Sequence, residues 1–124
     1  MECPFCKFQH LQEKIVARST HCYAIFDEFA VSKGHILIIS NQHADDWFTV
    51  KTEIQRDIMK LLNRMKIKLD KEFSPDGYNI GMNCRKAAGQ TVMHLHVHLI
   101  PRYIDDVENP QGGVRGVIPE KQQY

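Results

Sequence analysis

The segment VMHLHVHLI at positions 92–100 constrains the fold more than any other stretch, because histidines and apolar residues alternate along it with a period of two. Successive side chains of a β-strand point to opposite faces, so this pattern predicts a strand. One face carries Met93, Leu95, Val97 and Leu99, and the reverse carries His94, His96 and His98. We expect the apolar face to pack in the core and the imidazoles to share the other side.

A long amphipathic helix is predicted over residues 52–73, where apolar residues recur at helical spacing before Ser74 and Pro75. Further strand candidates, rich in β-branched and aromatic residues, lie at 14–18, 21–28, 34–40 and 77–83. Short turns between neighbouring strands favour antiparallel pairing. The expected fold class is therefore α+β, with an antiparallel sheet of about five strands in a meander and one long helix packed on it.

The chain has 124 residues, of which 43% are hydrophobic and 25% charged, and this composition suits a single domain. A formal net charge of +1 gives no broad attraction to nucleic acid or to an anionic membrane, so neither is an expected partner. No segment reaches the roughly 18 apolar residues of a membrane span, and the N-terminus lacks the apolar core of a secretory signal. We therefore expect a cytoplasmic protein.

Three imidazoles at period two favour a functional role, because each needs a hydrogen-bond partner or a ligand and close neighbours would oppose one another's protonation. Such a row suits a metal site, an acid/base relay or nucleophilic catalysis at phosphorus. A neutral imidazole is a good nucleophile near neutral pH and needs no separate base. The alternative is an exposed polar strand face with no chemical role.

The motif HLHVHLI, in which apolar residues separate three histidines, resembles the signature of the histidine triad (HIT) family. The segments AGQTV before it, GHILII at 34–39 and PR after it are also similar to that family. The resemblance implies a HIT domain over residues 1–104, extended by a C-terminal tail at 105–124. It also implies a nucleotide hydrolase or transferase that acts on the α-phosphate of a nucleoside substrate, commonly as a homodimer and without an organic cofactor.

The resemblance assigns roles to the catalytic histidines. His96 would be the nucleophile that forms a nucleotidyl-imidazole intermediate, and His98 would contact the phosphate or protonate the leaving group. His94 would act as scaffold or metal ligand, and His35 would pack beside the triad as a hydrogen-bond partner.

The remaining predicted site residues would bind the nucleotide. Backbone N–H groups of Gly89, Gln90 and Thr91, with the side chains of Asn83 and Gln90, suit a negatively charged phosphate. By the resemblance, Asp27 would accept hydrogen bonds from ribose hydroxyls.

The motif CPFC at positions 3–6 spaces two thiolates for one tetrahedral ion, typically zinc. Two further ligands are needed, and the spacing alone leaves His10, His21, His43 and His94 as candidates. The resemblance implies Cys3, Cys6, His43 and His94, and four protein ligands make a structural Zn²⁺ site. Two alternatives are a pair of reduced thiols without metal and a redox pair; the latter is disfavoured because the motif does not follow a strand and open a helix.

The leading functional hypothesis is a hydrolase of diadenosine polyphosphates or related nucleotide conjugates. A nucleoside phosphoramidase or a dinucleoside polyphosphate phosphorylase would use the same nucleophile with another leaving group or acceptor. A zinc-stabilised nucleotide-binding or interaction module without turnover is the alternative of a different class.

Overall fold

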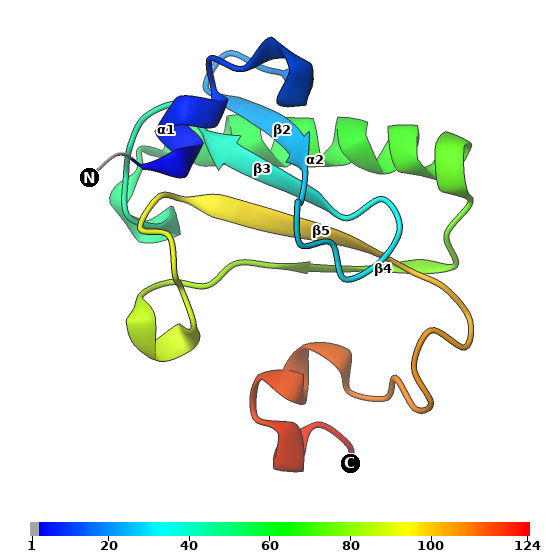
Figure 1. Ribbon diagram of the computed structural model, residues 1–124. Coiled ribbons are helices and arrows are strands. Elements are labelled where there is room, and N and C mark those ends of the chain that lie inside the picture. The colour runs from blue at the N-terminus through cyan, green and yellow to red at the C-terminus, as the bar shows by residue number, and fades with distance from the viewer. Residues whose placement is uncertain (1–2) are drawn as a thin grey trace.

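The computed structural model describes residues 3–124, so Met1 and Glu2 of the expected domain lie outside the described residues. Five antiparallel strands form one sheet in the order β1-β2-β3-β5-β4 (Figure 1). The strands are β1 (Ile15–Arg18), β2 (Cys22–Phe26), β3 (Ile36–Ser40), β4 (Gly77–Gly81) and β5 (His96–Arg102). The helices are α1 (Pro4–Phe8) and α2 (Thr52–Phe73), with short 3-10 turns at Gln12–Lys14, Trp47–Thr49, Lys86–Ala88, Gly113–Val117 and Pro119–Lys121.

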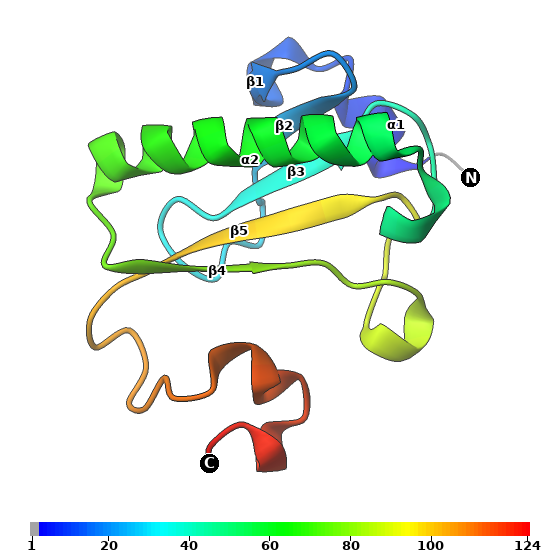
Figure 2. The same cartoon turned by 180° about the vertical axis from the view of Figure 1, so that it is seen from behind.

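The long helix α2 covers one face of the sheet, as Figure 2 shows from behind. Its apolar stripe is buried against the side chains of β2, β3 and β5 that point towards it, among them Ala24, Ile38 and Val97. The helix ends where Ser74 adopts the left-handed conformation with φ of 47° and Pro75 follows. The predicted α+β class and the bounds of this helix are confirmed.

The opposite face of the sheet carries the histidines. In β5, Val97 and Leu99 point to α2, so His96 and His98 point away from it. Their partners across the pairing with β3 are Ile39 and Leu37. These β3 side chains belong to a second apolar cluster, which α1 covers with the buried ring of Phe5. The chain thus places imidazoles and an apolar wall on the same side.

The predicted strand at 92–100 is displaced along the chain: β5 begins at His96 and continues to Arg102. Before it the backbone turns, because the N–H of His94 donates to the carbonyl of Val92 and the N–H of Leu95 donates to that of Ala44. His94 therefore precedes the strand instead of lying within it. Met93, which we expected in the core, is 41% exposed for the same reason.

The connection through α2 also changes the strand order expected of a simple meander. After α2 the chain forms β4 at the sheet edge and returns as β5 between β3 and β4. At this edge Ile80 is 49% exposed. Residues 105–124 lie beside β4, beyond the sheet (Figure 1). No helix within residues 3–124 is long and apolar enough to cross a membrane.

A buried carboxylate fixes the turn between β1 and β2 to α2. Asp57 on α2 accepts hydrogen bonds from the Ser19 hydroxyl at 2.6 Å and from the backbone N–H of His21 at 2.7 Å. Burial alone raises the pKa of Asp57, but the hydrogen bonds from Ser19, His21 and Cys22 outweigh it and the net pKa is lowered. The carboxylate is therefore the form that stabilises the folded state.

Replacing this carboxylate, as in Asp57→Asn, is expected to lower the free energy of unfolding at pH 7 by about 1–3 kcal/mol, because a buried donor loses its acceptor. The pKa of Asp57 in the folded state lies below its ordinary value. The difference in free energy of unfolding between wild type and variant should therefore reach its maximum above about pH 4 and shrink as the pH falls through the lowered pKa. Urea unfolding across this range measures it. Glu53→Gln, an exposed change on the same helix, is the control, and an equal loss in both variants would contradict the assignment.

Candidate active site and metal centre

A cavity of about 370 Å³ opens on the face of the sheet that carries His96 and His98. Its size is within the range of small-ligand sites. The apolar part of its wall comes from α1, β2, β3 and the neighbouring loops, with the side chains of Pro4, Phe5, Phe8, Ile25, Phe29, Leu37 and Val92. The polar part comprises Asp27, Glu28, Asn83, Gly89, Thr91, His96 and His98. One side of the cavity is thus suited to an aromatic base and the other to polar groups.

The hydrogen bond made by His96 defines its tautomer. Nδ1 lies 2.7 Å from the backbone carbonyl of His94, and because a carbonyl only accepts, Nδ1 carries the proton. In the neutral ring the second nitrogen, Nε2, then bears the lone pair. The ring is 8% exposed and packs against Phe5 at a centroid distance of 4.9 Å. An oriented, unprotonated nitrogen at a cavity wall has the properties of a nucleophile.

The tautomer of His98 is set through His35. The backbone N–H of Val31 donates to Nδ1 of His35 at 3.1 Å, so the proton of His35 is on Nε2. That nitrogen lies 2.9 Å from Nδ1 of His98, which must accept. His98 therefore carries its own proton on Nε2. For His35 and for His98, the hydrogen-bond partner is compatible with only one neutral tautomer.

Both rings are kept neutral by their surroundings. Burial lowers the pKa of His98 to about 4, and the neighbouring His96 and His35 add to this effect while Asp27 opposes it. Burial also lowers the pKa of His35 against the opposing effect of Asp27. At neutral pH the pair is therefore uncharged, and His98 is a neutral N–H donor.

Asp27 lies beside these rings at the end of β2. One carboxylate oxygen accepts from the backbone N–H of Phe29 at 2.8 Å, and the other lies 3.4 Å from Nε2 of His35 and 4.0 Å from Nδ1 of His98. Asp27, His35 and His98 form one of two groups whose geometry could hold a metal. For His35 to bind a metal through Nε2, the proton would have to move to Nδ1, which already faces the Val31 N–H. The observed contacts favour a proton-linked pair at this position.

The loop between β4 and β5 supplies the remaining polar wall. Asn83, Gly89 and Thr91 line the cavity, and their contact with phosphate stays a prediction. Gly89 ends the 3-10 turn with φ of 97°, a conformation that favours glycine. Gln90 is different: its side chain is buried, accepts from the N–H of Arg85 and donates to the carbonyl of Asp45, each at 2.6 Å. The expectation that this side chain meets phosphate does not fit its position, because its amide already organises the loop.

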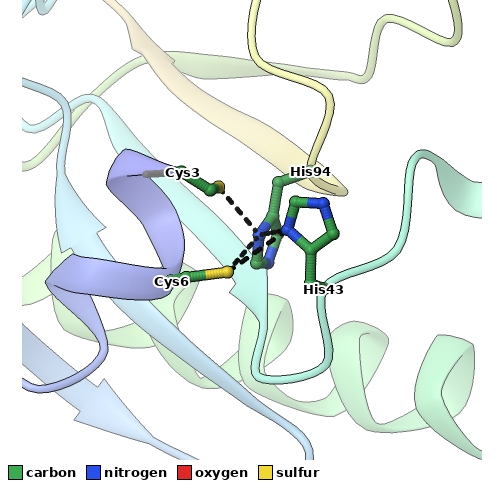
Figure 3. A group of neighbouring side chains, drawn as sticks. All are labelled: Cys3, Cys6, His43 and His94. Atoms are coloured by element: carbon green, nitrogen blue, oxygen red, sulfur yellow. Dashed lines mark hydrogen bonds between the residues drawn. The ribbon is translucent and has the colours of Figure 1, made fainter. Parts of the chain in front are cut away.

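The second group of candidate ligands consists of Cys3, Cys6, His43 and His94 (Figure 3). Cys3 is the N-cap of α1 and Cys6 lies within this helix. His43 follows β3, and His94 precedes β5. Nδ1 of His94 lies 3.3 Å from Sγ of Cys3, 3.5 Å from Sγ of Cys6 and 3.2 Å from Nδ1 of His43. His10 and His21, which the sequence left open as ligands, are not members of this group.

The donor set and its geometry fit zinc. A tetrahedral ion with ligand bonds of about 2.0–2.3 Å has ligand-to-ligand edges of about 3.3–3.8 Å, close to the separations found here. Nε2 of His94 donates to the carbonyl of Ser40 at 2.7 Å, so Nδ1 presents its lone pair to the group. Burial lowers the pKa of His94, which keeps it in the neutral form that binds metals. His94 therefore faces this group and does not line the cavity.

Several residues of the cavity are not evident from sequence reasoning. Pro4, Phe5 and Phe8 line the cavity, although the sequence pattern of this segment indicated only a role for its cysteines. Phe29 also lines the cavity while 86% exposed. The aromatic spacing around CPFC is the available signal, but a pattern alone does not place α1 over β2 and β3.

The chain is similar to known proteins. The family model described as HIT domain matches residues 9–105. An uncharacterized 16.1 kDa HIT-like protein of Mycoplasma pneumoniae is 34% identical over 88 residues, or 71% of this chain and 61% of that protein, so the chain spans about three fifths of that relative. Adenosine 5'-monophosphoramidase hnt1 of Schizosaccharomyces pombe is 34% identical, with 82% of this chain and 75% of the relative covered. AP-4-A phosphorylase of Mycobacterium tuberculosis is 27% identical, with 83% and 55% covered.

Solved structures agree with these relatives. A HIT family protein from Bacillus anthracis superposes with a TM-score of 0.78 at 37% identity, over 87% of this chain and 79% of the other. A Zn-bound histidine triad family protein from Mycobacterium smegmatis gives a TM-score of 0.74 at 28% identity, over 82% and 76%. The family match over most of the chain, the 34% identity to a relative and the common fold together show that this chain belongs to the HIT family.

Proposed function

We propose that the chain is a nucleotidyl-transfer enzyme that cleaves at the α-phosphate of dinucleoside polyphosphates, such as diadenosine tetraphosphate, or of related nucleotide conjugates. The observation that carries this proposal is the tautomer of His96, whose Nδ1 proton is engaged by the His94 carbonyl at 2.7 Å. The lone pair on Nε2 is then free to attack phosphorus. The named activities of two relatives, a phosphoramidase and a phosphorylase, are consistent with nucleotide chemistry.

In the first step, Nε2 of His96 forms a bond to the α-phosphorus while the bond to the leaving group breaks. His98, whose ring centroid is 5.4 Å from that of His96, donates a hydrogen bond from Nε2 to the leaving-group oxygen, which departs as a phosphate anion. In the second step water attacks the same phosphorus, the N–P bond breaks to regenerate the neutral His96 ring, and the water proton passes to solvent. The backbone N–H of Gly89 already donates to the Lys86 carbonyl, and that of Gln90 donates to the Arg85 carbonyl, contrary to the sequence expectation for these two groups. The backbone N–H of Thr91 and the side chain of Asn83, which both line the cavity, would therefore meet the charge that develops on the phosphate oxygens.

The substrate class has two alternatives within the same chemistry. A phosphoramidase would release an amine, and a phosphorylase would transfer the nucleotidyl group from His96 to inorganic phosphate. A module that binds nucleotide without turnover is the alternative of another class. The cavity of about 370 Å³ accepts one nucleoside with its phosphate, so the departing half of the substrate would extend outside.

We also propose a structural zinc ion held by Cys3, Cys6, His43 and His94. When bound, it would supply positional constraint instead of Lewis acidity, because four protein ligands leave no open position. His94 would then be fixed at both nitrogens, by the ion at Nδ1 and by the Ser40 carbonyl at Nε2. The His94 carbonyl that orients His96 would be fixed as a consequence.

A homodimer is the third part of the proposal. β4 is an edge strand, and Ile80 on this strand is 49% exposed. Met59 and Ile67 on α2 are also exposed, at 58% and 57%. Two copies related by a two-fold axis could cover these apolar side chains together.

Removing the nucleophile, as in His96→Ala, is expected to lower turnover of dinucleoside polyphosphates by at least about 10³-fold, because no N–P bond can form. Product chromatography with and without inorganic phosphate, on a panel that includes adenosine phosphoramidate, measures the loss and names the acceptor. His10→Ala, an exposed histidine outside the cavity, is the control. Equal inactivity of wild type and His96→Ala, with nucleotide binding retained in both, would instead support the binding module.

Zinc analysis of the purified chain is expected to find about one ion per chain, and Cys6→Ala should reduce this content strongly because a thiolate ligand is lost. Elemental analysis by mass spectrometry provides the count, and thermal unfolding should show a lower Tm for the depleted protein. Cys84→Ala, which removes a thiol outside the group, should keep its zinc. A wild-type chain that binds no zinc at micromolar free metal would refute the site.

Light scattering after gel filtration is expected to give twice the chain mass of 14.4 kDa. Ile80→Lys places a charge on the proposed interface and should shift the mass to that of one chain, whereas Phe48→Lys, at an exposed apolar residue outside that interface, should leave it unchanged. A wild-type mass of one chain at micromolar concentration would contradict the dimer.

A further inference from the structure

The short helix α1 takes part in two sites at once. Cys3 and Cys6 contribute to the metal group, and Phe5 between them turns its ring to the other side. That ring is 7% exposed and lies edge-on to His94 and His96, with centroid distances of 5.9 and 4.9 Å. The same residue lines the cavity. Movement of α1 would therefore disturb the proposed nucleophile and the nucleotide wall together.

The anchorage of α1 is limited. A helix of five residues has no stability of its own in water, so its position depends on tertiary contacts. These are the packing of Phe5 on the apolar cluster of β2 and β3, a hydrogen bond from the Tyr23 hydroxyl to the Phe5 carbonyl, and the cysteines. With zinc bound, Cys3 and Cys6 would join α1 covalently to His43 and His94. Loss of the ion would leave Phe5 as the main contact.

The structure also corrects one argument from the sequence. We disfavoured a redox pair because the CPFC motif does not follow a strand and open a helix. The structure places Cys3 at the N-cap of α1 and Cys6 within it, although no strand precedes them in the described residues. This spacing at the start of a helix is compatible with a disulfide. The ligand atoms of the group already lie within 4.8 Å of one another. A disulfide needs a sulfur separation of about 2.05 Å, which is incompatible with two separate zinc ligands.

We propose that Cys3 and Cys6 are an oxidative modification site that controls the nucleotide cavity through Phe5, a positioning residue for His96. In the oxidation, two thiolates lose one electron each to a peroxide, a sulfur–sulfur bond forms, and the peroxide takes up two protons to give two molecules of water. The zinc ion leaves unchanged as Zn²⁺. Phe5 then withdraws from His96, and nucleotide affinity and turnover fall. The effect on turnover rests on the proposed function, whereas the effect on binding does not.

The test uses the zinc-loaded full chain with Cys84→Ser, so that Cys84 cannot react. Hydrogen peroxide is added in stoichiometric amounts, and three quantities are followed: zinc release with a chromogenic chelator, loss of two hydrogen atoms from the Cys3–Cys6 peptide by mass spectrometry, and AMP binding by calorimetry. We expect all three to change together, with AMP affinity and turnover reduced at least about tenfold, the loss of one good aromatic contact. Dithiothreitol with zinc should restore them, which separates the disulfide from irreversible oxidation.

Phe5→Ala separates the positioning role from general destabilisation. This variant loses a buried ring and should unfold at a lower Tm, so it is compared with wild type at a temperature where both are folded. There it should keep its zinc but bind AMP about as weakly as the oxidised protein, and peroxide should weaken it no further. Phe5→Leu, which retains apolar bulk, should recover part of the affinity. Zinc release without a change in AMP affinity would overturn the proposal, as would thiols that stay reduced under peroxide. A chain that binds AMP under this control but never turns over would refute only the proposed function.

Discussion

The hydrogen bond between Nδ1 of His96 and the carbonyl of His94 is the contact on which the site depends. It selects the tautomer that leaves Nε2 unprotonated, and it joins the ring to the backbone of a residue that is itself fully buried. His94 is held in turn at Nε2 by the Ser40 carbonyl. A backbone carbonyl orients the His96 ring without placing a charge in the protein interior. A carboxylate partner would have buried a negative charge, which is energetically costly.

The cavity has an unusual charge distribution for a nucleotide site. Among its described lining residues there is no lysine or arginine, and Asp27 and Glu28 are acidic. In the proposed function, neutral donors would therefore meet the phosphate, and the Nε2–H of His98 and the backbone N–H of Thr91 are of this kind. Because burial lowers the pKa of His98 to about 4, its ring stays neutral at physiological pH. The uncharged imidazole pair keeps its proton assignments fixed over the pH range in which the protein would work.

Periodicity was sufficient to predict the fold class and the residues of α2, because the 3.6-residue and two-residue patterns report directly which face is buried. It also predicted that His96 and His98 share a face. It did not predict the insertion of β5 between β3 and β4, since pairing partners depend on the crossover through α2. The turn before His96 and the internal use of Gln90 depend on contacts with the loop at 44–45, which no local pattern contains. The aromatic contribution of α1 was missed for the same reason.

The central claim is the assignment of protons in the histidine network, and nitrogen NMR of the imidazoles tests it most directly. Long-range ¹⁵N–¹H correlation spectra of the zinc-loaded chain at pH 7 distinguish the two neutral tautomers from the cation. The account predicts the Nδ1–H form for His96 and the Nε2–H form for His35 and His98. A His96 ring protonated at Nε2, or charged at both nitrogens, would contradict it, because no lone pair would then be available to attack phosphorus.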